Sequence, residues 1–292
     1  GLNLGVIRNK NFTWDVNLAF ARNWSKITEL PNGDDVSNNW FIGERLNVLR
    51  DYTSAGIITT DGITMRTKDG DRHYTLQEVY DTFGPGGQGL KWYEGQMAVN
   101  DWNNDGKIND EDKQIFGCTD PKWTGSLSST MTYKGFDFSF MLYTKQGQWS
   151  RSYFHEQYMN YGDRGRQKVN FDYYIPAGTP VLDKNTGDVT YLSEAHIGKY
   201  PYPNNTEKTG GGYFSSSSAA VRYHKTSFVK VKNITLGYTF PKAWLSKIAV
   251  KHLRLYVNVI NPFCFTDYEG FDPEWASANL TNGGPASVTY QI

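Results

Sequence analysis

A period-two alternation of large apolar and small polar side chains constrains the fold of this 292-residue chain more than any other feature. Between residues 12 and 20 every second residue is large and apolar, and the residues between them are small and mostly polar. Successive side chains of a β-strand point to opposite faces, so this pattern predicts a strand with one apolar face. About seven segments pass the same test. They are LNLGVI near the N-terminus and residues 12–20, 127–133, 136–143, 234–240, 253–259 and 286–292.

The connections between these expected strands favour a β-barrel wall over a β-sandwich. Short connections, such as Lys134–Gly135, alternate strictly with long ones that cover residues 25–124, 148–225 and 264–284. Loops longer than about 15 residues are uncommon in compact domains. In an antiparallel meander all the long connections lie at one end of the sheet, as they do in outer-membrane barrels. We therefore predict an all-β fold in which residues 25–124 and 148–225 are long extracellular excursions.

Composition agrees with a β-protein and excludes some functions. Aromatic residues make up 15% of the chain, although its mean hydropathy is −0.60. Many rings in a polar, glycine-rich sequence are typical of β-structure. The 30 basic and 30 acidic residues cancel, so no net charge attracts nucleic acid or an anionic membrane surface. No apolar run reaches the length of about 18 residues that predicts a transmembrane helix, whereas a barrel strand needs only about ten alternating residues.

The segment DWNNDGKINDED at residues 101–112 has the ligand spacing of a calcium loop. We predict that it binds calcium as a structural ion through side-chain oxygens and the main-chain carbonyl of Lys107. The side chains are those of Asp101, Asn103, Asp105, Asn109 and Asp112, with Gly106 at the tight turn. The last of them replaces the usual glutamate, which makes the site weaker or more contracted. The preceding EGQMAVN does not predict the helix of an EF-hand, and a turn cluster of side-chain to main-chain hydrogen bonds is the alternative.

The second excursion contains GQWSRSYFHEQYMNYGDRGR, which is dense in aromatic and basic residues. Such rings stack on sugars and arginines donate hydrogen bonds, so the segment supplies weak ligand-binding candidates. They are Trp149, Arg151, Tyr153 and Tyr158. Packing of the loop onto itself or onto a lid protein is the alternative that we favour, because a long ordered loop needs its own small core.

No catalytic site is predicted from the sequence. The five histidines are scattered without metal-ligand spacing, and no serine or cysteine lies in a nucleophile motif. We expect the histidines to be ordinary solvated side chains. Cys118 and Cys264 both fall near the long-loop ends of strands, where a disulfide and two unrelated thiols are both compatible with the sequence.

Four stretches resemble one protein family, the SusC/RagA-type TonB-dependent transporters of the bacterial outer membrane. FTWDVNLAFARNWSKITEL is similar to a strand of that family, and DWNNDGKINDEDKQIFG is similar to its D-x-N-G-D-G loop. TSFVKVKNITLGYTFPKAW and LRLYVNVINPFCFTDYEGFDPEW are similar to two long motifs, in the family's order. Phe228 and Lys230 stand where the family often has Tyr and Arg. The chain ends in SVTYQI, without the aromatic last residue usual in the family.

The resemblance implies that residues 1–292 are the C-terminal part of a barrel of about 22 strands with a plugged lumen. The plug domain and TonB box are expected upstream of this chain. The implied function is TonB-dependent uptake of oligosaccharides or peptides across the outer membrane, with a SusD-like lipoprotein as the lid. The implied partners are that lipoprotein, the TonB complex, the substrate and outer-membrane lipid, and neither nucleic acid nor an enzymatic activity is expected.

Two other functions stay open at the level of the sequence. One is a secreted all-β glycan-binding module with a calcium loop, which would be soluble without detergent. The other is a TonB-dependent receptor for metal chelates, which would not co-purify with a surface lipoprotein. The sequence itself does not identify the substrate.

Overall fold

The computed structural model describes the chain except for residues 85–88, 156–171, 184, 203–221 and 277–286. The chain divides into two compact units. The first unit comprises residues 1–47, 118–150 and 225–292, and the second comprises residues 48–117 and 151–224. Within the described residues, the structure contains no helix with the length and apolar character needed to span a membrane.

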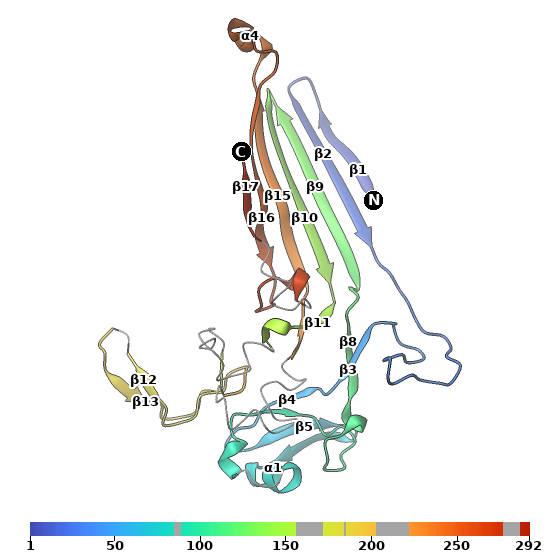
Figure 1. Ribbon diagram of the computed structural model, residues 1–292, viewed down its shortest axis with the longest axis vertical. Coiled ribbons are helices and arrows are strands. Elements are labelled where there is room, and N and C mark those ends of the chain that lie inside the picture. Colours follow the sequence, from blue (N-terminus) through green and yellow to red (C-terminus); the bar gives the residue numbers. More distant parts are fainter. Residues whose placement is uncertain (85–88, 156–171, 184, 203–221, 277–286) are drawn as a thin grey trace. The chain divides into compact units, whose positions relative to one another are not determined.

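A seven-stranded antiparallel sheet dominates the first unit (Figure 1). Its strands, in spatial order, are β1 (Leu2–Arg8), β2 (Phe12–Ala21), β9 (Trp123–Tyr133), β10 (Phe136–Gln146), β15 (Phe228–Thr239), β16 (Arg254–Phe265) and β17 (Thr289–Gln291). The all-β fold and the expected strands are confirmed. The last expected strand, 286–292, forms only as the short β17, and its first residue lies outside the described part of the chain.

Short and long connections alternate along this sheet. Residues 9–11 join β1 to β2, and Lys134–Gly135 join β9 to β10. Residues 240–253 join β15 to β16 and contain the short helix α4 (Lys242–Leu245) and the 3-10 turn η4 (Ser246–Ile248). Because neighbouring strands are antiparallel, the three long connections all leave from the opposite end of the sheet (Figure 1).

One face of the sheet carries the large apolar side chains. We call the side that bears Phe12, Trp14, Val16 and Leu18 the apolar face, and the other side the polar face. In the register of β2 with β9, Val16 lies opposite Ser129 on the apolar face. The Ser129 hydroxyl accepts a hydrogen bond of 3.0 Å from Nε1 of Trp14, so these two polar groups satisfy each other on the apolar side.

A bulge in β15 changes which residues face the apolar side. Ile234 pairs with Phe140 and Asn233 with Met141, but Val231 pairs with Leu142, so Lys232 is an extra residue. Strict alternation back from Ile234 would put Lys230 on the apolar face. The bulge instead places Lys230 opposite Tyr143 on the polar face, because one extra residue reverses the sides of all that precede it.

The remaining strands pair in twos among the described residues. The pairs are β3 (Val48–Asp51) with β8 (Gln114–Cys118), β4 (Ser54–Ile57) with β7 (Met97–Val99), β5 (Ile63–Thr67) with β6 (Gly70–Tyr74), β11 (Trp149–Arg151) with β14 (Tyr223–Lys225), and β12 (Pro180–Leu182) with β13 (Val189–Tyr191). The 3-10 turns η1 (Leu90–Trp92), η2 (Asp110–Asp112) and η5 (Pro273–Trp275) complete the elements, together with helix α1 (Leu76–Phe83).

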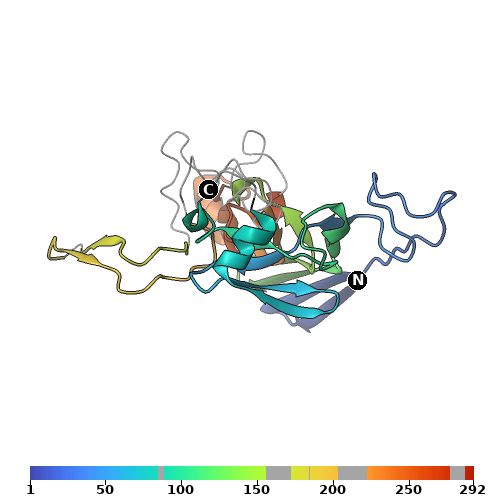
Figure 2. The ribbon, with the colours of Figure 1, turned by 90° about the horizontal axis from the view of Figure 1, so that it is seen from below.

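Helix α1 covers one side of a small hydrophobic core in the second unit. Thr75 and Glu78 cap its N-terminus reciprocally, each side chain bonding the other residue's main-chain N–H. Figure 2 shows the helix over the β5–β6 hairpin. Its buried Val79 packs with a cluster of side chains from the hairpin, from and beside η1, from β7 and from the segment after β4. The cluster contains Ile58, Ile63, Met65, Tyr74, Trp92, Tyr93 and Ala98.

The two cysteines do not pair with each other. Cys118 is a buried free thiol and Cys264 an exposed one. Of the two arrangements compatible with the sequence, the structure has the unrelated thiols.

Candidate functional site: an ion cluster at the rim of the sheet

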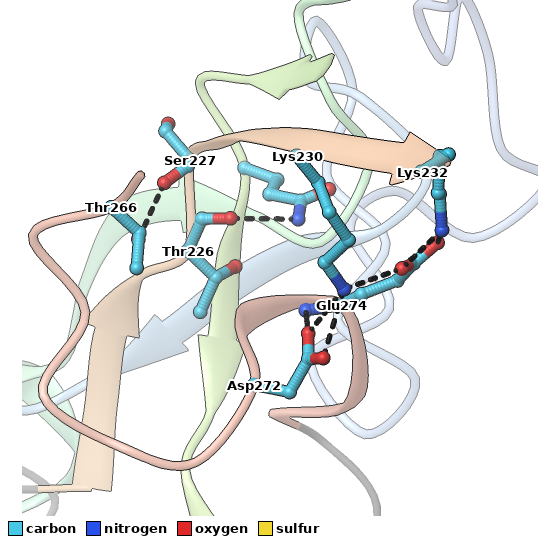
Figure 3. Close-up of polar contacts among 8 residues, drawn as sticks. Thr226, Ser227, Lys230, Lys232, Thr266, Asp272 and Glu274 are labelled. Carbon is cyan, nitrogen blue, oxygen red and sulfur yellow. Dashed lines mark hydrogen bonds and ion pairs between the residues drawn. The ribbon is translucent and has the colours of Figure 1, made fainter. Parts of the chain in front are cut away.

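The two longest motifs of the sequence meet in an ion cluster. Lys230 Nζ donates to both carboxylate oxygens of Asp272 at 2.8 Å and to Oε2 of Glu274 at 2.8 Å (Figure 3). Lys232 Nζ reaches the same Glu274 carboxylate at 2.7 and 3.0 Å. The lysines come from SFVKVKNITLGY in β15, and the carboxylates from the GFDPEW segment that follows β16. Two ammonium groups and two carboxylates balance each other's charge.

Local structure on both segments positions these four groups. The bulge at Lys232 turns Lys230 to the polar face, as described above. The Asp272 side chain caps η5 by accepting a 2.9 Å hydrogen bond from the Glu274 N–H, and Pro273 holds the first position of the turn. The Thr266 hydroxyl donates to the carbonyl of Ser227 at 2.8 Å, which fixes the start of the same segment (Figure 3).

Burial makes the pairing obligatory. The side chains of Lys230 and Asp272 are only 2% and 5% exposed. A buried charge without a partner is costly, so neither residue is stable here without the other. At Glu274, burial acts to raise the pKa of the carboxyl, but the hydrogen bonds from Lys230 and Lys232 outweigh it and lower that pKa. The cluster therefore fastens the segment after β16 onto β15.

The sequence reasoning missed this cluster as a site. The motifs served only to show resemblance, and no role was assigned to the two lysines or the two carboxylates. A signal was present: two lysines, two residues apart, interrupt the apolar and small residues of a strand. Charged side chains on a membrane strand need a partner, and the DPE sequence supplies two carboxylates.

The calcium-type loop folds around two fully buried carboxylates. Asp101 accepts hydrogen bonds from the N–H groups of Gly106 at 2.9 Å and Asp105 at 3.2 Å. Asp112 accepts from the N–H groups of Asn109 at 2.8 Å and Asn103 at 3.2 Å. Gly106 has φ +78°, a conformation that favours glycine. The first and last predicted ligands are thus brought together with the middle of the loop.

The chemistry of the loop fits a hard cation only in part. Burial raises the pKa of the Asp112 carboxyl, and the N–H groups of Asn109 and Asn103 oppose this rise. Asn103 Nδ2 donates to the Glu111 carboxylate at 3.0 Å, and the Asp105 carboxylate accepts from the Lys107 N–H at 2.8 Å. Within the described residues, no three His, Cys, Asp or Glu side chains are grouped to hold a metal ion. Calcium binding stays a prediction.

The weak ligand-binding candidates fall into separate contacts. The Arg151 guanidinium lies over the Tyr153 ring, 5.1 Å from its centre, and Lys225 Nζ lies 5.6 Å from the centre of the Trp149 ring. Tyr158 lies outside the described residues. Their role in binding a ligand stays a prediction.

One histidine differs from the expectation of solvated side chains. His155 is fully buried, and its ring stacks on that of His224 with centres 3.6 Å apart. Its Nδ1 lies 2.6 Å from the Ser152 hydroxyl, and its Nε2 lies 3.3 Å from the Tyr200 hydroxyl. Burial, with the nearby His224 and Lys199, lowers the pKa of His155 to about 2. The expectation was wrong here because residues distant in sequence enclose the ring.

Comparisons with known proteins agree with the barrel architecture. The chain is 28% identical to the TonB-dependent receptor SusC of Bacteroides thetaiotaomicron over 293 residues, which is all of this chain and 25% of the relative. It is 27% identical to a TonB-dependent receptor of Formosa agariphila, over 97% of this chain and 28% of the relative. A solved RagAB peptide transporter matches with a TM-score of 0.58 at 18% identity, covering 99% of this chain and 27% of that one. No family model matches.

The fold defines a class of protein, an outer-membrane β-barrel whose wall includes this sheet. The expected outer-membrane location is confirmed by these relatives. The chain is similar along its whole length to SusC/RagA-type TonB-dependent transporters, as the sequence resemblance predicted. The chain spans about a quarter of the length of these relatives. These relatives are named as receptors and transporters rather than enzymes, which agrees with the sequence, from which no catalytic site was predicted.

Proposed function

We propose that this chain forms wall strands and extracellular loops of a TonB-dependent importer that takes up oligosaccharides or peptides. The observation that carries the proposal is the similarity to SusC along the whole chain, on a sheet whose long connections all leave from one end. The predicted excursions, residues 25–124 and 148–225, contain both segments of the second unit, 48–117 and 151–224. Two excursions that fold together support an ordered extracellular entrance.

The substrate classes come from the relatives and from the loop chemistry. One solved structure of similar fold is a peptide transporter by name, and the oligosaccharide alternative comes from the family resemblance of the sequence. A SusD-like lipoprotein is the proposed lid, and the TonB complex supplies the driving force through a plug domain. Trp149, Arg151, Tyr153 and Tyr158 are the proposed contacts with substrate, through ring stacking and arginine hydrogen bonds.

The alternative of a soluble glycan-binding module is disfavoured by the apolar face. Leu255 and Phe265 are 59% and 62% exposed, and they belong to a row of exposed apolar residues on β16. Exposed apolar patches of this kind on a soluble monomer would promote aggregation, whereas hydrocarbon covers them in a membrane.

Co-purification separates the importer from the remaining alternative. The full-length protein, tagged in its native host and extracted in mild detergent, is expected to bring down a surface lipoprotein in a stoichiometric complex. Deleting its gene is expected to abolish growth on the oligosaccharide or peptide that the complex imports, and unaffected growth on iron chelates is the control. Recovery of the protein without a lipoprotein, together with a growth defect only on metal chelates, would favour a receptor for metal chelates.

We also propose that calcium occupies the loop at residues 101–112 as a structural ion. Calcium at about a hundred times its dissociation constant stabilises a binding-competent loop by about 2.7 kcal/mol. We therefore expect calcium to slow proteolysis between residues 101 and 112 of the full-length protein. Asp105→Ala, which removes a predicted ligand, is expected to abolish the protection. Asp71→Ala, an exposed aspartate of β6 in the same unit, is the control and should retain it. Equal digestion in calcium and in chelator would exclude the ion.

A further inference from the structure

An apolar groove of about 570 Å³ lies on the sheet near the ends of β2, β9 and β10 that lead into the long connections. Most of its lining residues belong to the apolar face. In the register of the sheet, Leu2 lies opposite Leu18, Leu18 opposite Leu127, and Leu127 opposite Leu142. With Val229 of β15, the groove therefore crosses five neighbouring strands on the side of the barrel wall that meets hydrocarbon.

A glycine makes room for the groove. Gly125 lies between Phe20 and Thr144 in the register, and its φ is outside the left-handed region, so its backbone does not require glycine. A Cβ at this position would lie 3.3 Å from both the Thr144 methyl and the Trp123 ring. The Thr144 hydroxyl is occupied by its 2.6 Å hydrogen bond to the carbonyl of Phe228. The Thr144 side chain beside Gly125 therefore has its hydroxyl satisfied by the main chain.

Aromatic and basic residues mark the end of the groove nearest the long connections. The rings of Phe20 and Trp123 form a tilted pair with centres 5.7 Å apart. Two residues beyond Phe20, the Arg22 guanidinium lies 5.4 Å from the centre of the Trp24 ring. Aromatic belts lie at the membrane interface, and a guanidinium at that level can pair with a lipid phosphate.

We propose that this groove holds one acyl chain of lipid A, the lipid part of lipopolysaccharide, with Arg22 beside its phosphate. The proposal rests on the outer-membrane location and on the proposed extracellular side of the long connections. The groove is continuous with the apolar face, so a ligand enters it from the bilayer. A chain seated in the groove contacts side chains on two sides as well as the floor, which gives it more dispersion contacts than a flat wall does. Lipid A lies in the outer leaflet, at the level of the groove, so it is the lipid that supplies the acyl chain.

Lipid retention by the full-length protein tests this assignment. The protein is extracted from its native outer membrane, and lipid A bound per protein is measured by native mass spectrometry. Gly125→Leu fills the groove and is expected to reduce retained lipid A about tenfold, since a few methylene contacts change affinity by that factor. Arg22→Ala is expected to give a smaller reduction. Val257→Leu, on the exposed apolar face of β16 outside the groove, should leave retention unchanged.

Heat-modifiable migration on gels shows which variants fold. If Gly125→Leu does not fold, Gly125→Ala replaces it and is expected to reduce retention about twofold to threefold, because one methyl narrows the floor. Equal retention in the wild type and a folded Gly125 variant would overturn the proposal. The proposal would also be overturned if Gly125→Leu reduced a bound phospholipid instead of lipid A. It would be overturned as well if the wild type were a complex of two copies and Gly125→Leu lost the second copy.

Discussion

Replacing Lys230 by methionine is expected to release the segment after β16 from the sheet. The substitution keeps the length of the side chain but leaves the buried Asp272 carboxylate without the lysine that neutralises it. Breaking a buried pair in this way costs about 3–5 kcal/mol. Glu274 keeps Lys232, so the loss falls mainly on Asp272. Hydrogen exchange of residues 266–276 in the full-length protein is expected to accelerate by roughly a hundredfold or more.

Two matched variants test whether the cause is the unpaired charge. Lys232→Met removes a lysine that is 29% exposed and whose partner Glu274 retains Lys230, so we expect a loss of at most about 1 kcal/mol. Adding Asp272→Asn to Lys230→Met removes the unpaired charge and keeps a side chain that can cap η5. The double variant should recover much of the protection. Equal exchange in wild type and Lys230→Met would contradict the role assigned to the cluster.

The cluster restricts the conformation of the segment that follows β16. A buried ion pair is weak evidence for overall stability, because apolar replacements of both partners are often neutral. The cluster instead contributes specificity. Lys230 and Lys232 are the lysines of β15, and Asp272 and Glu274 pair with both of them, so the segment takes one position on the polar face. A fixed segment at the end of the sheet narrows the set of conformations that this end adopts.

The strands of the sheet were predictable because their signal is local. Alternation between residues 12 and 20 depends only on neighbours two apart, and the apolar face is its direct result. The bulge in β15 was not predictable in this way. Lys230 and Ile234 have the same parity, so alternation alone assigns them to one face, and only pairing with β10 and β16 separates them.

The second unit shows the limit of local patterns. Its strands have three to five residues, too few for a clear period, and its core joins Val79 of α1 to Met65, Trp92 and Ala98. The helix had its own signal, a threonine followed three residues later by glutamate. The calcium-type loop was found from its spacing, which local sequence determines. The ion cluster joins residues 42 and 44 positions apart and needed the fold.

His155 illustrates the same limit and leads to a pH dependence. The ring is enclosed by Ser152, Tyr200 and the stacked ring of His224, with Lys199 adding positive charge nearby. Burial is the main reason that its pKa falls to about 2 from the ordinary value of 6.5, and the two charges act in the same direction. His155 is therefore neutral in the folded unit at neutral pH.

Acidification is expected to destabilise the second unit through this histidine. Below an ordinary pKa of 6.5 the unfolded chain binds a proton that the folded unit rejects, so stability falls as the pH falls. The loss approaches about 1.4 kcal/mol per pH unit well below pH 6.5, and it amounts to about 2.3 kcal/mol between about pH 6.5 and about pH 4.5. Hydrogen exchange of residues 48–84 and 172–183 in the full-length protein, corrected for intrinsic rates, measures it. His155→Asn should flatten the profile, and the exposed His73→Asn should retain the wild-type slope. A slope that persists in His155→Asn would assign the acid sensitivity to other groups.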